Sequence, residues 1–81
     1  MTISAFKNLP QRQQMAHLAA HGRPLAEREQ DSFALSLFAV GRFYAEVWRS
    51  RGEEAILFVH VFDQPGGLHD YLELISLRGL R

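Results

Sequence analysis

The sequence predicts a single α+β domain, residues 1–81, in which an N-terminal helix, a three-stranded antiparallel β-meander and a short C-terminal helix follow one another in the order αβββα. Three observations support this prediction. The 81-residue chain is too short for two separate hydrophobic cores. Its apolar residues recur first with a helical period, then with a period of two, and finally with a helical period again. Glycines stand at the changes of period, where turns would separate the elements.

The composition is that of a globular chain without thiol chemistry. Hydrophobic residues make up 47% of the chain and charged residues 22%. Cysteine is absent, which excludes a disulfide, a thiolate metal site and a cysteine nucleophile. Lys and Arg number 9, as do Asp and Glu, so no overall charge would attract nucleic acid or an anionic membrane. No signal-peptide core and no membrane-spanning run is evident, so we expect a cytoplasmic location.

The first helix is expected from Pro10 to His21. Asn8 can cap its free amides, and Pro10 suits the first turn because its missing N–H would have no partner there. Gly22 is expected to end the helix in the left-handed conformation. The apolar positions at helical spacing are Leu9, Met15, Leu18 and Ala19, and the solvated side consists of Gln11, Arg12, Gln13 and Gln14.

The segment from Arg23 to Asp31 is interpreted as a connection. It contains Pro24 and then the polar run from Glu27 to Gln30, and it shows no apolar stripe. Its charges are expected to lie on a solvated surface.

Two strands with a period of two come next, separated by a turn from Val40 to Arg42. In the first, one face holds Phe33, Leu35 and Leu37, and the other holds Ala34 and Ser36. In the second, one face holds Phe43, Ala45 and Val47, and the other holds Tyr44, Glu46 and Trp48.

A third strand is expected from Ala55 to Phe62 and a closing helix from Leu68 to Ser76. The strand is apolar almost throughout, which indicates that both of its faces are covered. One face holds Ala55, Leu57, Val59 and Val61, and the other holds Ile56, Phe58, His60 and Phe62. The helix places Leu68, Tyr71, Leu72 and Ile75 on one side, and Asp70 suits the positive end of its dipole.

The second face of the predicted sheet is the candidate dimer or ligand face. Two short helices cover one side of a three-stranded sheet, and the other side is then expected to be polar. Here it is mostly aromatic or aliphatic, which favours contact with a second copy of the chain across a two-fold axis. The alternative is that the connection from Arg23 to Gln30 or the N-terminal segment covers it. The residues of this face are Tyr44, Glu46, Trp48, Ile56, Phe58, His60 and Phe62.

An acid–base pair lies within this face. His60 and Glu46 point the same way from neighbouring strands and could share a hydrogen bond. An enzyme built on this pair is one alternative function. No serine, threonine or lysine is obviously placed as a nucleophile, so the pair is interpreted as structural and no catalytic residue is assigned.

A nucleic-acid-binding domain is the other alternative. Arg42, Arg49 and Arg51 stand at strand ends, where they could grip phosphates, and Tyr44 and Trp48 could stack on bases. The predicted element order also matches the double-stranded RNA-binding fold in outline. Such domains hold phosphates with basic residues around the start of the last helix. This chain has Leu68, His69 and Asp70 at that place.

Metal binding rests on one histidine pair. His17 and His21 are four residues apart on the first helix, the spacing that metal ligands on helices use. No third ligand is near them, and Leu18 follows His17 where the metalloprotease signature requires Glu. No metal and no cofactor is therefore predicted.

Three short stretches resemble an uncharacterised family of small bacterial proteins. The stretches are Phe43-Tyr44-Ala45-Glu46-Val47-Trp48, Val59-His60-Val61-Phe62 and Leu72-Glu73-Leu74-Ile75. The family pattern is a Phe-Tyr-Val-Glu-Val-Trp strand, an Ile-Arg-Ser-Phe strand and a closing Pro-Tyr-Leu-Glu helix, of which Tyr71, Leu72 and Glu73 match the end. The resemblance covers about Ser32 to Ser76 and implies no activity. This chain departs from the family pattern at three positions. Asp70 stands where the pattern has proline, His60 stands where it has arginine, and Phe58 stands where a polar residue is expected.

Taken together, these features predict a small homodimeric binding or interaction module of a bacterial cytoplasm that is not an enzyme. The nucleic-acid-binding domain and the enzyme using His60 and Glu46 remain the alternatives.

Overall fold

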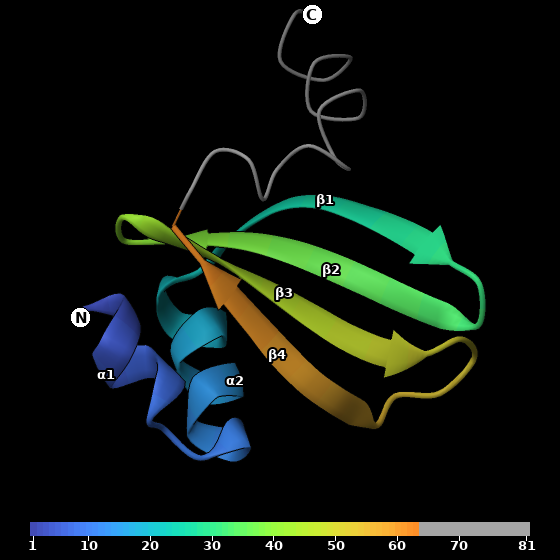
Figure 1. Ribbon diagram of the computed structural model, residues 1–81, viewed down its shortest axis with the longest axis horizontal. Coiled ribbons are helices and arrows are strands. Elements are labelled where there is room, and N and C mark those ends of the chain that lie inside the picture. Colours follow the sequence, from blue (N-terminus) through green and yellow to red (C-terminus); the bar gives the residue numbers. More distant parts are fainter. Residues whose placement is uncertain (64–81) are drawn as a thin grey trace, which may run out of the picture.

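The structure, a computed structural model, describes residues 1–63, which form two N-terminal helices and a four-stranded antiparallel sheet (Figure 1). The helices are α1 (Ile3–Lys7) and α2 (Gln11–His21), and the strands are β1 (Arg23–Gln30), β2 (Phe33–Val40), β3 (Phe43–Ser50) and β4 (Ile56–Phe62). The strands lie side by side in chain order, so the sheet is a meander. The predicted α+β class is confirmed. The expected helix from Leu68 to Ser76 lies outside the described residues.

The prediction of three strands is wrong, because the segment interpreted as a connection is strand β1. It pairs with β2 from Arg23 opposite Ala39 to Gln30 opposite Phe33. As an edge strand it can leave most of its side chains in solvent, since backbone hydrogen bonds to one neighbour do not require an apolar stripe. The tight turn into β2 begins at Asp31, whose φ of 55° is in the left-handed region that Asp tolerates.

One face of the sheet packs against both helices. Phe6 of α1 is fully buried, and its ring centroid lies 5.4 Å from that of Phe43. The predicted grouping of alternate β3 residues on one face is confirmed, because all three lie in this buried cluster. Its members are Phe6, Leu18, Val40, Phe43, Ala45, Val47 and Val61.

Strand β4 departs from the predicted alternation at its start. Trp48 is opposite Phe58, whereas the next β3 residue, Arg49, is opposite Ile56. This register shift leaves Leu57 as an extra residue, in the manner of a β-bulge. Ile56 packs against the cluster under the helices. The prediction that Ile56 shares a face with Phe58 is therefore wrong.

Helix α2 covers nearly the expected residues. The way in which it begins and ends, however, differs from the prediction. Asn8 does not cap α2; it ends α1, where its backbone N–H donates to the carbonyls of Phe6 and Ser4. Gly22 has φ −79° and ψ 148°, which is extended and not left-handed. A Cβ on Gly22 would lie 2.6 Å from the Leu18 carbonyl oxygen, so close approach accounts for the glycine.

Gln14 is buried, although it was placed on the solvated side of the helix. Its Nε2 donates a 3.0 Å hydrogen bond to the carbonyl oxygen of Phe6. Helix α1, which the sequence did not predict, supplies that carbonyl. Ala19, expected among the apolar positions, is exposed.

Replacing this buried amide should destabilise the fold. We expect Gln14→Ala to lower the free energy of unfolding by about 1–2 kcal/mol, because a buried hydrogen bond between α1 and α2 is lost. The matched variant Gln13→Ala, at the exposed neighbouring position, should change it by less than about 0.5 kcal/mol. Urea denaturation followed by circular dichroism measures both. Equal effects of the two variants would contradict a stabilising role for the hydrogen bond of Gln14.

Candidate functional site

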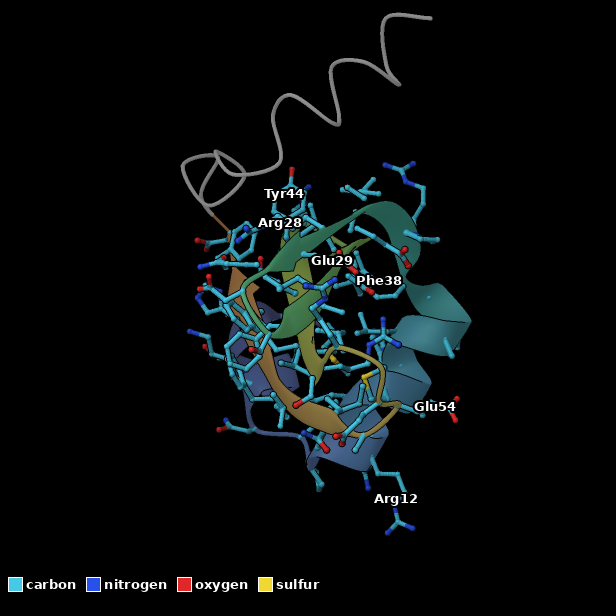
Figure 2. The ribbon with its side chains drawn as sticks, turned by 90° about the vertical axis from the view of Figure 1, so that its right-hand side faces the viewer. Arg12, Arg28, Glu29, Phe38, Tyr44 and Glu54 are labelled. Atoms are coloured by element: carbon cyan, nitrogen blue, oxygen red, sulfur yellow. The ribbon has the colours of Figure 1, made fainter. Side chains whose placement is uncertain are left out.

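The candidate site occupies the sheet face opposite the helices, on β3 and β4. The register places Tyr44 opposite Phe62, Glu46 opposite His60 and Trp48 opposite Phe58. Figure 2 shows Tyr44 and Arg28 away from the helices, and Phe38 toward them. The structure thus brings together the predicted residues of this face, with the exception of Ile56. We call the six paired β3 and β4 residues the aromatic face.

Two aromatic stacks define this face. The rings of Tyr44 and Phe62 stack with centroids 5.5 Å apart, and those of Trp48 and Phe58 stack at 5.1 Å. Phe33 of β2 extends the second stack by meeting Trp48 edge-on at 5.5 Å. Each stack joins directly opposed residues of neighbouring strands, where side chains interact most closely. Between the stacks lies the pair Glu46 and His60.

Glu46 is a buried carboxylate with partners on three strands. The residue is only 6% exposed. Its Oε1 accepts a 2.7 Å hydrogen bond from the indole Nε1 of Trp48. The Nδ1 of His60 lies 3.5 Å from the same oxygen, and the guanidinium Nη2 of Arg28 lies 4.0 Å from Oε2. These partners offset the loss of water around the charge.

His60 and Glu46 lie opposite each other on neighbouring strands, but the two residues differ in access to solvent. The imidazole is 58% exposed, whereas the carboxylate side chain is 8% exposed. Their 3.5 Å separation is long for a hydrogen bond. Trp48, Phe62 and Arg28 lie next to the pair, and none of these three side chains is a nucleophile. The geometry is that of a satisfied buried acid beside an exposed base.

Arg28 is the member of this cluster that the sequence did not predict. It lies on β1, within the segment interpreted as a connection. On a strand, Arg28 shares a face with Ala26, but the segment has no apolar stripe that would indicate a strand.

The structure does not bring the three candidate phosphate-binding arginines together. Arg49 follows Trp48 and turns to the helix side, where its Nη2 donates to Ser36 Oγ at 3.3 Å. Arg51 forms a 3.3 Å ion pair with Glu29. Arg42 lies in the turn between β2 and β3, at the opposite end of β3 from Arg51. No common basic surface next to Tyr44 and Trp48 results.

The histidine pair on α2 packs as aromatic rings. The centroids of His17 and His21 are 4.8 Å apart, and His17 also meets Phe6 edge-on at 5.9 Å. Residues 1–63 contain no group of three or more side chains placed to hold a metal ion.

Comparison of the chain with protein-family models, with curated proteins and with solved structures found no match. Within the described part of the chain, no helix has both the length and the apolar character needed to cross a membrane.

Removing the Glu46 charge should weaken the sheet. We expect Glu46→Gln to lower the free energy of unfolding by about 1–3 kcal/mol, because the buried charge facing Arg28 is lost. The emission of Trp48, the single tryptophan, should also shift, because its indole bonds to this side chain. The control Glu54→Gln changes an exposed residue distant from Tyr44 and Arg28 (Figure 2) and should do neither. Identical unfolding curves for both variants would refute this role of Glu46.

Proposed function

We propose that this chain is a small homodimeric interaction module without catalytic activity, and that the aromatic face belongs to its assembly surface. The observation that supports this most directly is the exposure of Phe58. Its side chain stacks on Trp48 in the sheet face opposite the helices, yet the residue is 47% exposed. Large apolar side chains left in water on a sheet face are typical of contact surfaces.

The chemistry of Glu46 favours closure of this face by another protein surface. A buried interface is destabilised when it traps an unpaired charge. Here the carboxylate already accepts from Trp48 and lies near Arg28 and His60 within its own chain. A partner can therefore cover the face without having to supply a counter-charge. The exposed imidazole adds a polar group that could contact the partner.

The same geometry argues against the enzyme alternative. A general acid or base has to reach a substrate proton within hydrogen-bond distance. Glu46 is almost fully enclosed by its neighbours, and the more accessible His60 lies between aromatic rings. The arrangement supports binding in preference to proton transfer.

The nucleic-acid alternative has less support, because the residues it requires diverge. Tyr44 and Trp48 lie on one face, while Arg49 lies on the other and Arg51 is paired with Glu29. Salt-dependent retention on heparin would favour this alternative, since phosphate binding by Lys and Arg depends strongly on salt.

The solution mass tests the proposed function. Light scattering after size exclusion should give a dimer for the wild type and a folded monomer for Phe58→Glu, because the variant places a charge in the contact surface. Ala20→Glu adds the same charge on the exposed side of α2 and should remain dimeric. A wild-type monomer at tens of micromolar would overturn the proposal. Circular dichroism checks that each variant is folded.

A further inference from the structure

We propose that two copies of this chain join edge to edge through β4, with the two β4 strands antiparallel about a two-fold axis. The two four-stranded sheets would then form one continuous sheet. This inference rests on the proposed homodimer and adds its contact surface and geometry. It concerns the backbone edge of β4, which the aromatic face alone does not involve.

The two edges of the sheet differ in how they are protected. Strands β1 and β4 lie at the edges (Figure 1). Natural proteins guard an edge with proline, bulges and charged side chains, because its unpaired N–H and C=O groups otherwise recruit another strand. Strand β1 has such devices: Pro24 has no N–H, the register shifts between Pro24 and Ala26, and the charged residues Glu27, Arg28 and Glu29 follow.

Strand β4 has little of this protection. Its sequence Ile-Leu-Phe-Val-His-Val-Phe contains no proline, lysine, arginine or carboxylate. Its one register shift lies at the start, and the residues from Phe58 to Phe62 pair regularly with β3. Within residues 1–63, β4 has a strand neighbour only on its β3 side. Figure 1 shows the beginning of β4 extending away from the helices.

Two consecutive exposed apolar residues lie at the start of the β4 edge. Leu57 is 46% exposed and Phe58 is 47% exposed. Leu57 is the extra residue of the bulge, and Phe58 is the first residue of β4 that pairs regularly with β3. A strand added beside β4 lies next to both.

The chemistry of β4 fits a second copy of itself as the added strand. Pairing about Val59, the middle of β4, places Phe58 opposite His60, within the part of β4 that pairs regularly with β3. Apolar or aromatic residues then face one another, and no two like charges are opposed, which would destabilise the pair. On the aromatic face, the row from Glu46 through His60 would continue into Phe58 and Trp48 of the second copy. A two-fold axis makes the contact self-complementary.

A cysteine scan tests the geometry in this cysteine-free chain. Phe58→Cys, Val59→Cys and His60→Cys are each oxidised with glutathione disulfide and resolved on a non-reducing gel. We expect the highest yield of covalent dimer at Val59, where a residue meets its own copy, and lower yields on either side. Glu27→Cys, exposed on the β1 edge, should give none. No covalent dimer from any β4 position, or an equal yield at Glu27, would overturn the inference.

A charge variant separates this inference from the proposed function. Leu57→Lys should weaken the dimer at least about tenfold in light scattering, because it places a charge beside the paired edge. Ala20→Lys, exposed on α2, is the control and should not. If wild type and Leu57→Lys dimerise equally while Phe58→Glu is monomeric, the copies stack through the aromatic face; the proposed function then stands and the edge pairing fails. A monomeric wild type would overturn both.

Discussion

The structure depends on the register of β3, because this strand has neighbours on both sides and buried residues on both faces. Phe43, Ala45 and Val47 lie under the helices, while Glu46 is buried on the opposite face. A slip of one residue would move every β3 side chain to the other face. It would place the carboxylate against Phe6 and Leu18, away from its partners. Burial of the apolar β3 residues under the helices and placement of the Glu46 carboxylate among its partners therefore require the same register.

Glu46 is the buried polar centre of the sheet face that carries the two aromatic stacks. Its partners come from β1, β3 and β4, so one side chain connects strands across the width of the sheet. Buried charges of this kind contribute less to stability than their Coulomb attraction suggests, since each group has lost water. Their contribution here is to keep the aromatic face free of an unpaired charge. That property suits a surface that another protein covers.

The two proposals meet at β4, which belongs both to the aromatic face and to the sheet edge. The helices cover one face of the sheet, which thereby forms the core. Strand β1 carries the bulge, the proline and the charges that discourage the addition of another strand. Leu57 and Phe58 remain about half exposed at the start of the other edge strand. The core of a domain of this size is small, and the proposed association would add to the apolar area that folding alone buries.

The sequence by itself determined α2, β2, β3, most of β4 and the pairing of Glu46 with His60, because hydrophobic periodicity fixes which side chains share a face. Only the tertiary structure decided the rest. Strand β1 forms by backbone pairing with β2, and such pairing requires no apolar stripe in the sequence. This strand brings Arg28 next to the carboxylate of Glu46. Gln14 is buried because α1 supplies a carbonyl acceptor, and Ile56 changes face because β4 has an extra residue at its start. These outcomes depend on which groups meet in space, and a local pattern does not contain that information.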